Sequence, residues 1–242
     1  MASPALTAAL RRVDAVFGGL TVSADGCSYC YGEDGLAPLA VPGALLGDDL
    51  LGSVFHEVPG HFPDHPAVVR RLLPEVFALL AAGRFSGMGF MSTGLGRVAW
   101  REWPPEQASA IEEFLDVWWR ETLADPAPVH GLDAVWRLSV DFHQAVAPLL
   151  DVWAAAPRGG VEDAHLADFV ELWIEDLLWD CVIGWPADDA LLPDLRAWLV
   201  EHVPDRLAGH PDPLPARKVA LLTIGDEDER YAAYLELIAS AG

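Results

Sequence analysis

The stretch PAVVRRLLPEVFALLAAG, residues 66–83, decides the fold class of this 242-residue chain. Its apolar side chains recur three and four residues apart, the spacing that places them on one face of an α-helix. This stripe consists of Val69, Leu72, Leu73, Val76, Phe77 and Leu80. Gly83 is expected to end the helix, and Pro74 inside it predicts a kink or a break.

The same helical period recurs along most of the chain, whereas the alternation that is typical of strands is nearly absent. Helices are predicted over about residues 1–20, 42–56, 66–83, 104–119, 131–155, 161–183, 188–202, 214–222 and 227–240. Short connections rich in proline and glycine imply antiparallel neighbours. The sequence therefore predicts an all-α fold, either an antiparallel helical bundle or an irregular, HEAT-like α-solenoid of about eight to ten helices.

Three segments rich in glycine or proline interrupt this pattern. Loops are expected at residues 20–43, 57–66 and 84–96. The last of them contains apolar side chains that could cover the core, namely Met88, Phe90 and Met91. We expect one helical domain over residues 1–242, with a soft division near residues 84–104.

Composition indicates a folded protein of a reducing compartment. Hydrophobic residues make up 52% of the chain and ten residues are tryptophan, which favours a large core over intrinsic disorder. The apolar runs are shorter than the roughly 18 to 20 residues of a membrane span, and Arg11 and Arg12 do not precede an apolar stretch as in a secretory signal. Three cysteines, an odd number, argue against a disulfide framework. We therefore expect a cytoplasmic protein.

Charge restricts the class of partner. The chain has 37 acidic and 15 basic residues, a formal net charge of −22. Such a surface repels phosphate backbones and anionic lipids, so binding to nucleic acid or to membranes is disfavoured. A partner selected by charge would be basic. The alternative is that the charge only keeps a tryptophan-rich protein soluble.

Two cysteines and two histidines form the strongest candidate site. Cys27 and Cys30 form a C-x-x-C pair, and His56 and His61 follow within FHEVPGHFPDH, residues 55–65. Two thiolates and two imidazoles can bind Zn²⁺ tetrahedrally, so the sequence predicts a zinc site at these four residues. The alternative is unliganded thiols with surface histidines and no cofactor. A thioredoxin-like redox pair is disfavoured because its strand-to-helix context is missing.

Two further motifs match only parts of known catalytic sites. In HEVPGH the histidines are five residues apart rather than four, and Pro59 and Gly60 would break the helix that an H-E-x-x-H metalloprotease needs. Glu162 and His165 match the E-x-x-H pattern of di-iron bundles, but the sequence has no second copy. We therefore expect a solvated acidic helix face over residues 162–180 beside a buried stripe.

The tryptophans are expected in the core. Five of them stand at the spacing of buried stripes: Trp118, Trp119, Trp153, Trp173 and Trp179. The alternative is a ligand pocket that some of them line.

Several segments of the first half of the chain resemble a group of uncharacterised bacterial proteins that are frequent in actinobacteria. The resemblance rests on the early helix, the C-x-x-C pair, RRLLPEVFALL at residues 70–80 and RVAWREWPPEQASAIEEFL at residues 97–115. It implies an all-α fold. It implies no activity and no functional residue.

Two functions of different class follow from these features. The first is a non-enzymatic, acidic helical binding protein, such as an inhibitor, an immunity-type protein or an adaptor, that recognises a basic partner. It is favoured because no complete catalytic set of residues is present and the net charge is −22. The second is a helical metal-dependent enzyme or ligand-binding protein that uses the Cys/His zinc site or a tryptophan-lined pocket.

Overall fold

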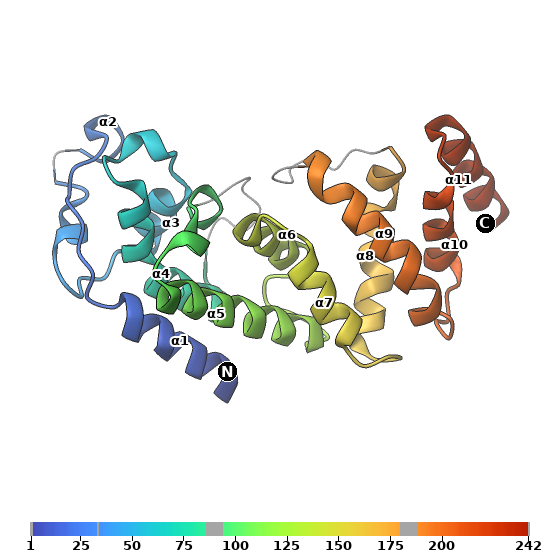
Figure 1. Ribbon diagram of the computed structural model, residues 1–242, viewed down its shortest axis with the longest axis horizontal. Coiled ribbons are helices and arrows are strands. Elements are labelled where there is room, and N and C mark those ends of the chain that lie inside the picture. Colours follow the sequence, from blue (N-terminus) through green and yellow to red (C-terminus); the bar gives the residue numbers. More distant parts are fainter. Residues whose placement is uncertain (1, 33, 86–93, 180–187, 242) are drawn as a thin grey trace. The chain divides into compact units, whose positions relative to one another are not determined.

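The computed structural model describes residues 2–32, 34–85, 94–179 and 188–241 (Figure 1). Over these residues the chain has eleven α-helices, ten of them seven residues or longer, and no strand. The predicted all-α fold class is therefore confirmed. Within the described part of the chain, no helix combines the length and the apolar character that crossing a membrane requires.

The chain divides into two compact units, Met1–Trp119 and Arg120–Gly242. The first contains α1 (Pro4–Phe17), α2 (Ser28–Tyr31), η1 (Ala37–Ala40), α3 (Asp48–His56), η2 (Pro59–His61), α4 (His65–Ala81), η3 (Leu95–Arg97), η4 (Trp100–Glu102) and most of α5 (Pro105–Ala124). The second begins at the end of α5 and contains α6 (Leu132–His143), α7 (Ala147–Ala155), α8 (Val161–Leu178), α9 (Asp188–Arg206), α10 (Leu214–Ala220), η5 (Leu221–Thr223) and α11 (Glu227–Ala241). A single domain with a soft division near residues 84–104 stays a prediction.

Helix α4 is the centre of the first unit. The Asp64 carboxylate caps it by accepting a hydrogen bond from the Ala67 N–H at 3.0 Å. The helix runs through Pro74 without the break that this residue could have caused. Buried residues before and after Pro74 hold the helix in place, among them Leu73 and Val76. Phe77 stacks on Phe114 of α5 with 4.0 Å between ring centroids. Its buried face also contacts α1.

Helix α3 is shorter than the predicted helix at residues 42–56. It begins only at Asp48, because Gly43 has a φ of 68° and Gly47 is the extended N-cap. Two aspartates in the first turn then favour helix formation through their interaction with the helix dipole. The predicted loop at residues 20–43 is confirmed, since the described residues of this segment form only two short helices, α2 and η1. The suggested plug of Met88, Phe90 and Met91 lies outside the described residues.

The predicted helix at residues 131–155 is two helices. Gln144 adopts the left-handed conformation, with a φ of 50°, and ends α6. Helix α7 begins at Ala147, followed by Pro148 in its first turn. The sequence pattern did not show this break because the apolar spacing continues across it.

An aromatic cluster forms the core of the second unit. Phe169 lies 4.9 Å from Trp136 and 5.4 Å from Trp153, measured between ring centroids, and Trp198 lies 6.1 Å from Trp153. Burial is confirmed for four of the five tryptophans that the stripes placed in the core, namely Trp118, Trp119, Trp153 and Trp173. Trp179 is the exception, since 42% of it is exposed at the C-cap of α8.

Candidate metal centre

The two cysteines are brought to one side by a single helical turn. Cys27 is the N-cap of α2, and its carbonyl oxygen accepts hydrogen bonds from the N–H groups of Cys30 and Tyr31, both at 3.1 Å. Residues three apart in such a turn lie on the same face. Gly32, with a φ of 71°, then ends the turn. The C-x-x-C spacing therefore places both thiols together through local structure alone.

His61 reaches the thiols because the chain turns sharply after α3. Glu57 is the extended C-cap of that helix, and Pro59–His61 forms the separate turn η2. The predicted failure of the H-E-x-x-H geometry is thus confirmed, since His56 and His61 do not share a helix. The Cys27 N–H donates a hydrogen bond to the His61 carbonyl oxygen at 3.0 Å, which joins the two segments.

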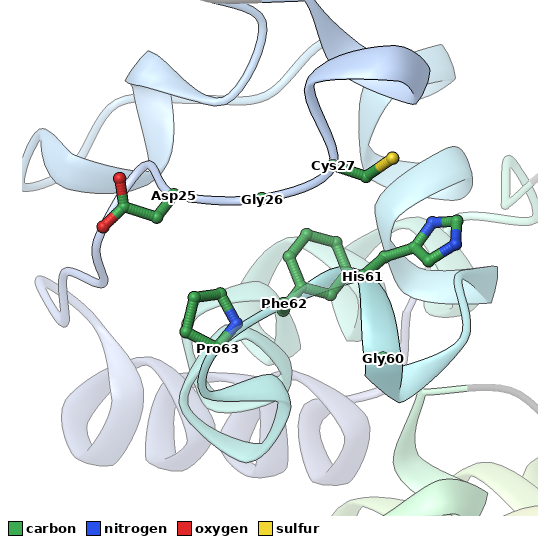
Figure 2. A pocket seen from close by; sticks show the side chains of 7 residues that line it. All are labelled: Asp25, Gly26, Cys27, Gly60, His61, Phe62 and Pro63. Atoms are coloured by element: carbon green, nitrogen blue, oxygen red, sulfur yellow. The ribbon is translucent and has the colours of Figure 1, made fainter.

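The joined segments border an open pocket (Figure 2). Its volume is about 470 Å³, and it is lined by Asp25, Gly26, Cys27, Gly60, His61, Phe62 and Pro63. A side chain at Gly26 would force the buried Leu36 to shift, because a Cβ there would lie 2.3 Å from Leu36 Cδ1. Glycine therefore lets the backbone before Cys27 pack closely against Leu36.

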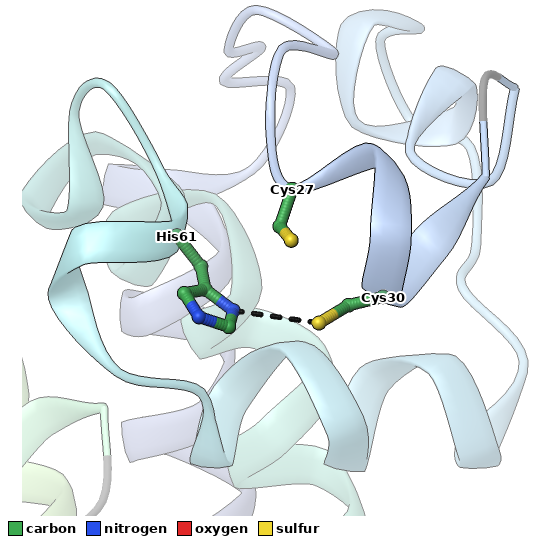
Figure 3. Close-up of side chains that lie close together, drawn as sticks. All are labelled: Cys27, Cys30 and His61. Atoms are coloured by element: carbon green, nitrogen blue, oxygen red, sulfur yellow. Dashed lines mark hydrogen bonds between the residues drawn. The ribbon is translucent and has the colours of Figure 1, made fainter.

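Cys27, Cys30 and His61 form a group that could hold a metal ion. One potential ligand atom from each residue lies within 4.8 Å of those from the other two. Figure 3 shows the two sulfurs and the imidazole directed toward a common point, with Cys30 Sγ 3.6 Å from His61 Nδ1. Cys27 is half-buried and Cys30 is exposed, so an ion could reach them from solvent.

The two thiols differ in acidity. The pKa of Cys27 is lowered, first by a hydrogen bond from the Cys30 backbone N–H and then by one from the Cys30 side chain. The pKa of Cys30 is raised, first by its hydrogen bond with Cys27 and then by burial. Cys27 is therefore the thiol that ionises more readily, and the thiolate is the form that binds metals.

Glu57 and Tyr31 lie next to this group. Glu57 Oε2 accepts a hydrogen bond from the Tyr31 hydroxyl at 3.0 Å and lies 3.1 Å from His61 Nδ1. Burial alone would raise the pKa of Glu57, but the Val58 N–H, Tyr31 and His61 together lower it. The pKa of Tyr31 is raised, mainly by burial and also by its bond to Glu57. In the sequence, Glu57 appeared only as the second residue of the HEVPGH segment, and its contact with His61 was not predicted.

His56, the fourth predicted ligand, does not belong to the group formed by the other three. Its ring lies against Phe85, with 5.6 Å between centroids. Its assignment as a ligand stays a prediction. The third cysteine, Cys181, lies outside the described residues.

The E-x-x-H segment of α8 is more buried than its sequence suggests. Asp163 and His165 are 4% and 9% exposed, while Asp168 is exposed as expected for a solvated face. His165 Nε2 lies 2.8 Å from the Asp125 carbonyl oxygen. These two buried side chains are therefore engaged inside the second unit rather than in solvent.

Comparison of the chain with protein-family models, with curated proteins and with solved structures finds no match. The resemblance to an actinobacterial group therefore stays a prediction. The geometry of Cys27, Cys30 and His61 carries the functional argument instead.

Proposed function

We propose that this protein binds a zinc ion through the thiolates of Cys27 and Cys30 and the imidazole of His61. The observation that supports the proposal is the convergence of three ligand atoms within 4.8 Å of one another. Thiolate and imidazole are the ligands that zinc uses in structural and catalytic sites alike. Hard cations such as Mg²⁺ and Ca²⁺ prefer oxygen, so the donor set favours zinc over them.

The ion would fasten a weakly packed segment of the first unit. Helix α2 has only four residues, none of them buried, and Tyr29 within it is 96% exposed. The turn is held by the backbone bond between Cys27 and His61 and by Tyr31, which bonds to Glu57 and stacks on Phe62, while Ser28, Tyr29 and Cys30 are exposed. Zinc binding contributes directly to folding free energy where the ligands come from separate segments. The zinc site would therefore act as a clamp between α2 and the turn after α3.

Elemental analysis of the untagged protein tests this proposal. We expect about one zinc per chain, from the single-site geometry, and loss of that zinc in Cys27→Ser, Cys30→Ser and His61→Asn. Ser28→Ala, an exposed position between the cysteines, and His210→Asn, in the second unit, should keep the metal. Zinc should also protect Cys27 and Cys30 from alkylation. A wild-type protein that neither contains zinc nor takes it up on dialysis would refute the proposal.

The charge distribution of the second unit supports a further proposal, that this unit binds a basic protein. Three of its basic residues are turned inward, because Arg206, Lys218 and Arg230 are 5%, 5% and 3% exposed. Many carboxylates remain exposed, among them Asp168, Asp194, Glu201, Asp205 and Glu227. The outer surface is thus more negative than the residue counts alone imply. Opposite charge on a partner would speed association and select that partner.

Retention of basic proteins from a native lysate tests this second proposal. We expect binding at low salt that is lost at high salt, because salt screens exposed charges. Neutralising Asp194, Glu201 and Asp205 of α9 should weaken retention. The matched control neutralises three exposed carboxylates of the first unit, Glu102, Glu106 and Glu112. Equal weakening in both variants would show a net-charge effect, and no retained partner would refute the proposal.

A further inference from the structure

The Glu57 carboxylate faces the same His61 nitrogen as the Cys30 thiol. Glu57 Oε2 lies 3.1 Å from His61 Nδ1, and Cys30 Sγ lies 3.6 Å from that nitrogen. A metal ion bound to Nδ1 would replace the proton there. The carboxylate oxygen would then face the ion rather than an N–H group.

The carboxylate is held in this position from several sides. Its Oε2 accepts a hydrogen bond from the Tyr31 hydroxyl, and its Oε1 accepts one from the Val58 N–H at 2.9 Å. The backbone carbonyl of the same residue accepts a hydrogen bond from Arg97 Nη1 at 2.7 Å. The side chain is only 19% exposed. Glu57 is therefore oriented before any ion binds, which limits the entropy that ordering it would cost.

Two distances measured from His61 Nδ1 agree with those of a tetrahedral zinc site. Bonds of about 2.3 Å to sulfur and about 2.05 Å to nitrogen place these two atoms roughly 3.6 Å apart at a tetrahedral angle. A bond of about 2.1 Å to a carboxylate oxygen places oxygen and nitrogen roughly 3.4 Å apart. The observed separations of 3.6 Å and 3.1 Å are close to both values.

Three other potential ligands of this part of the chain make contacts of their own. The ring of His56 lies against Phe85, and that of His65 is stacked on Phe62 with 6.1 Å between centroids. Asp25 accepts a hydrogen bond from the Ser23 hydroxyl at 2.5 Å. Neither these three donors nor Glu57 belongs to the group whose ligand atoms all lie within 4.8 Å of one another, so the Glu57 carboxylate would approach the sulfurs when the ion binds. Glu57 is the donor that the structure places against a ligand atom of that group.

We infer that Glu57 supplies the fourth ligand and closes a Cys₂-His-Glu zinc site. This inference rests on the proposed zinc binding by Cys27, Cys30 and His61. Binding of the ion releases the thiol protons to solvent, and the neutral imidazole binds through Nδ1 with its ring proton on Nε2, while no bond of the protein backbone changes. A closed, four-coordinate site has no position for water or substrate, so the site is structural rather than catalytic.

Cobalt substitution combined with azide tests the closed coordination. Tetrahedral Co²⁺ absorbs visible light, and azide changes that spectrum where it can displace a bound water. The spectrum of the wild-type protein should not respond to azide, whereas that of Glu57→Gln should respond. Glu57→Gln should also lower zinc affinity by at least about tenfold. Its amide oxygen can still accept from the Val58 N–H while its NH₂ group donates to the Tyr31 hydroxyl oxygen, so the local fold is kept.

Asp25→Asn is the matched control, because Asp25 lines the pocket beside Cys27 and His61 but bonds to the Ser23 hydroxyl rather than to His61. It should leave the spectrum and the zinc affinity unchanged. A wild-type spectrum that responds to azide would overturn Glu57 as a ligand while leaving zinc binding by the other three residues intact. A Glu57→Gln protein whose Co²⁺ spectrum does not respond to azide and whose zinc affinity equals that of the wild type would also overturn Glu57 as a ligand. Failure of the wild-type protein to bind Co²⁺ or Zn²⁺ at all would instead refute the proposed function and this inference with it.

Discussion

Arg206 and Asp163 form a buried ion pair, with Arg206 Nε 2.6 Å from Asp163 Oδ1 and side chains that are 1% and 5% exposed. The guanidinium also donates hydrogen bonds to carbonyl oxygens at the end of α7, including that of Trp153 at 2.9 Å. The second carboxylate oxygen accepts from the Gly159 N–H at 2.6 Å. The pair therefore joins α9 to the start of α8 and satisfies backbone groups that the turn after α7 leaves open.

Removing the acidic partner of this pair should destabilise the second unit strongly. Asp163→Ala leaves the Arg206 charge buried without a counter-ion and leaves the Gly159 N–H without its acceptor. We expect a loss of about 3–5 kcal/mol in the free energy of unfolding. Urea denaturation followed by circular dichroism measures it.

A surface pair provides the control for that experiment. Arg12 and Glu113 lie 2.6 Å apart with side chains that are 44% and 39% exposed. Glu113→Gln should therefore cost less than about 1 kcal/mol. Equal losses in Asp163→Ala and Glu113→Gln would contradict the importance assigned to the buried pair.

Two tryptophans should differ in their contribution to stability. Trp153 is fully buried, contacts Phe169 and donates a hydrogen bond to the Glu162 carbonyl oxygen at 2.9 Å. Trp153→Ala should cost about 3–5 kcal/mol through lost packing and a cavity. Trp179→Ala should cost about 1 kcal/mol or less, because this residue is 42% exposed and its ring lies against Tyr231 at the surface. Comparable denaturation midpoints for the two variants would contradict the placement of Trp153 in the core and of Trp179 at the surface.

A methyl group at Gly26 should disturb the first unit, whereas one at Gly60 should not. The new Cβ at position 26 would overlap Leu36, which is 3% exposed and has little room to move. We expect Gly26→Ala to lower stability by about 1–3 kcal/mol. At Gly60 a Cβ meets no atom within 4 Å, so Gly60→Ala is the matched control. Differential scanning calorimetry compares the melting temperatures of the two variants. A Gly26→Ala protein as stable as the wild type would disprove the close packing of Gly26 against Leu36.

Zinc removal should loosen the segment around Cys27. The hydrogen bond from the Cys27 N–H to the His61 carbonyl oxygen lies beside the proposed ion. We expect faster amide hydrogen exchange at residues 24–31 after chelation, and slower exchange when zinc is restored. Zinc at about one hundred times its dissociation constant should stabilise the folded unit by roughly 2.7 kcal/mol. Exchange that is the same with and without zinc would show that the ion does not clamp this segment.

The local parts of this protein could be predicted from the sequence, because they depend on neighbours along the chain. The apolar period identified the helices, and the all-α fold class is confirmed. The C-x-x-C spacing predicted two adjacent thiols, since a single turn brings residues 27 and 30 to one side. Errors occurred where one backbone angle decides the outcome. The left-handed Gln144 divides a predicted helix, and Gly43 and Gly47 delay the start of α3.

The site as a whole was decided by tertiary structure. His61, which is 34 residues from Cys27, reaches the thiols only because α3 ends and the chain turns at Pro59. His56 is equally suitable in chemistry and nearly the same distance away in sequence, yet it packs against Phe85. Glu57 likewise faces His61 only through that turn. Which donors share one ion depends on where the chain turns after α3 and on the contacts that fix the turn, and the spacing of residues along the chain does not contain that information.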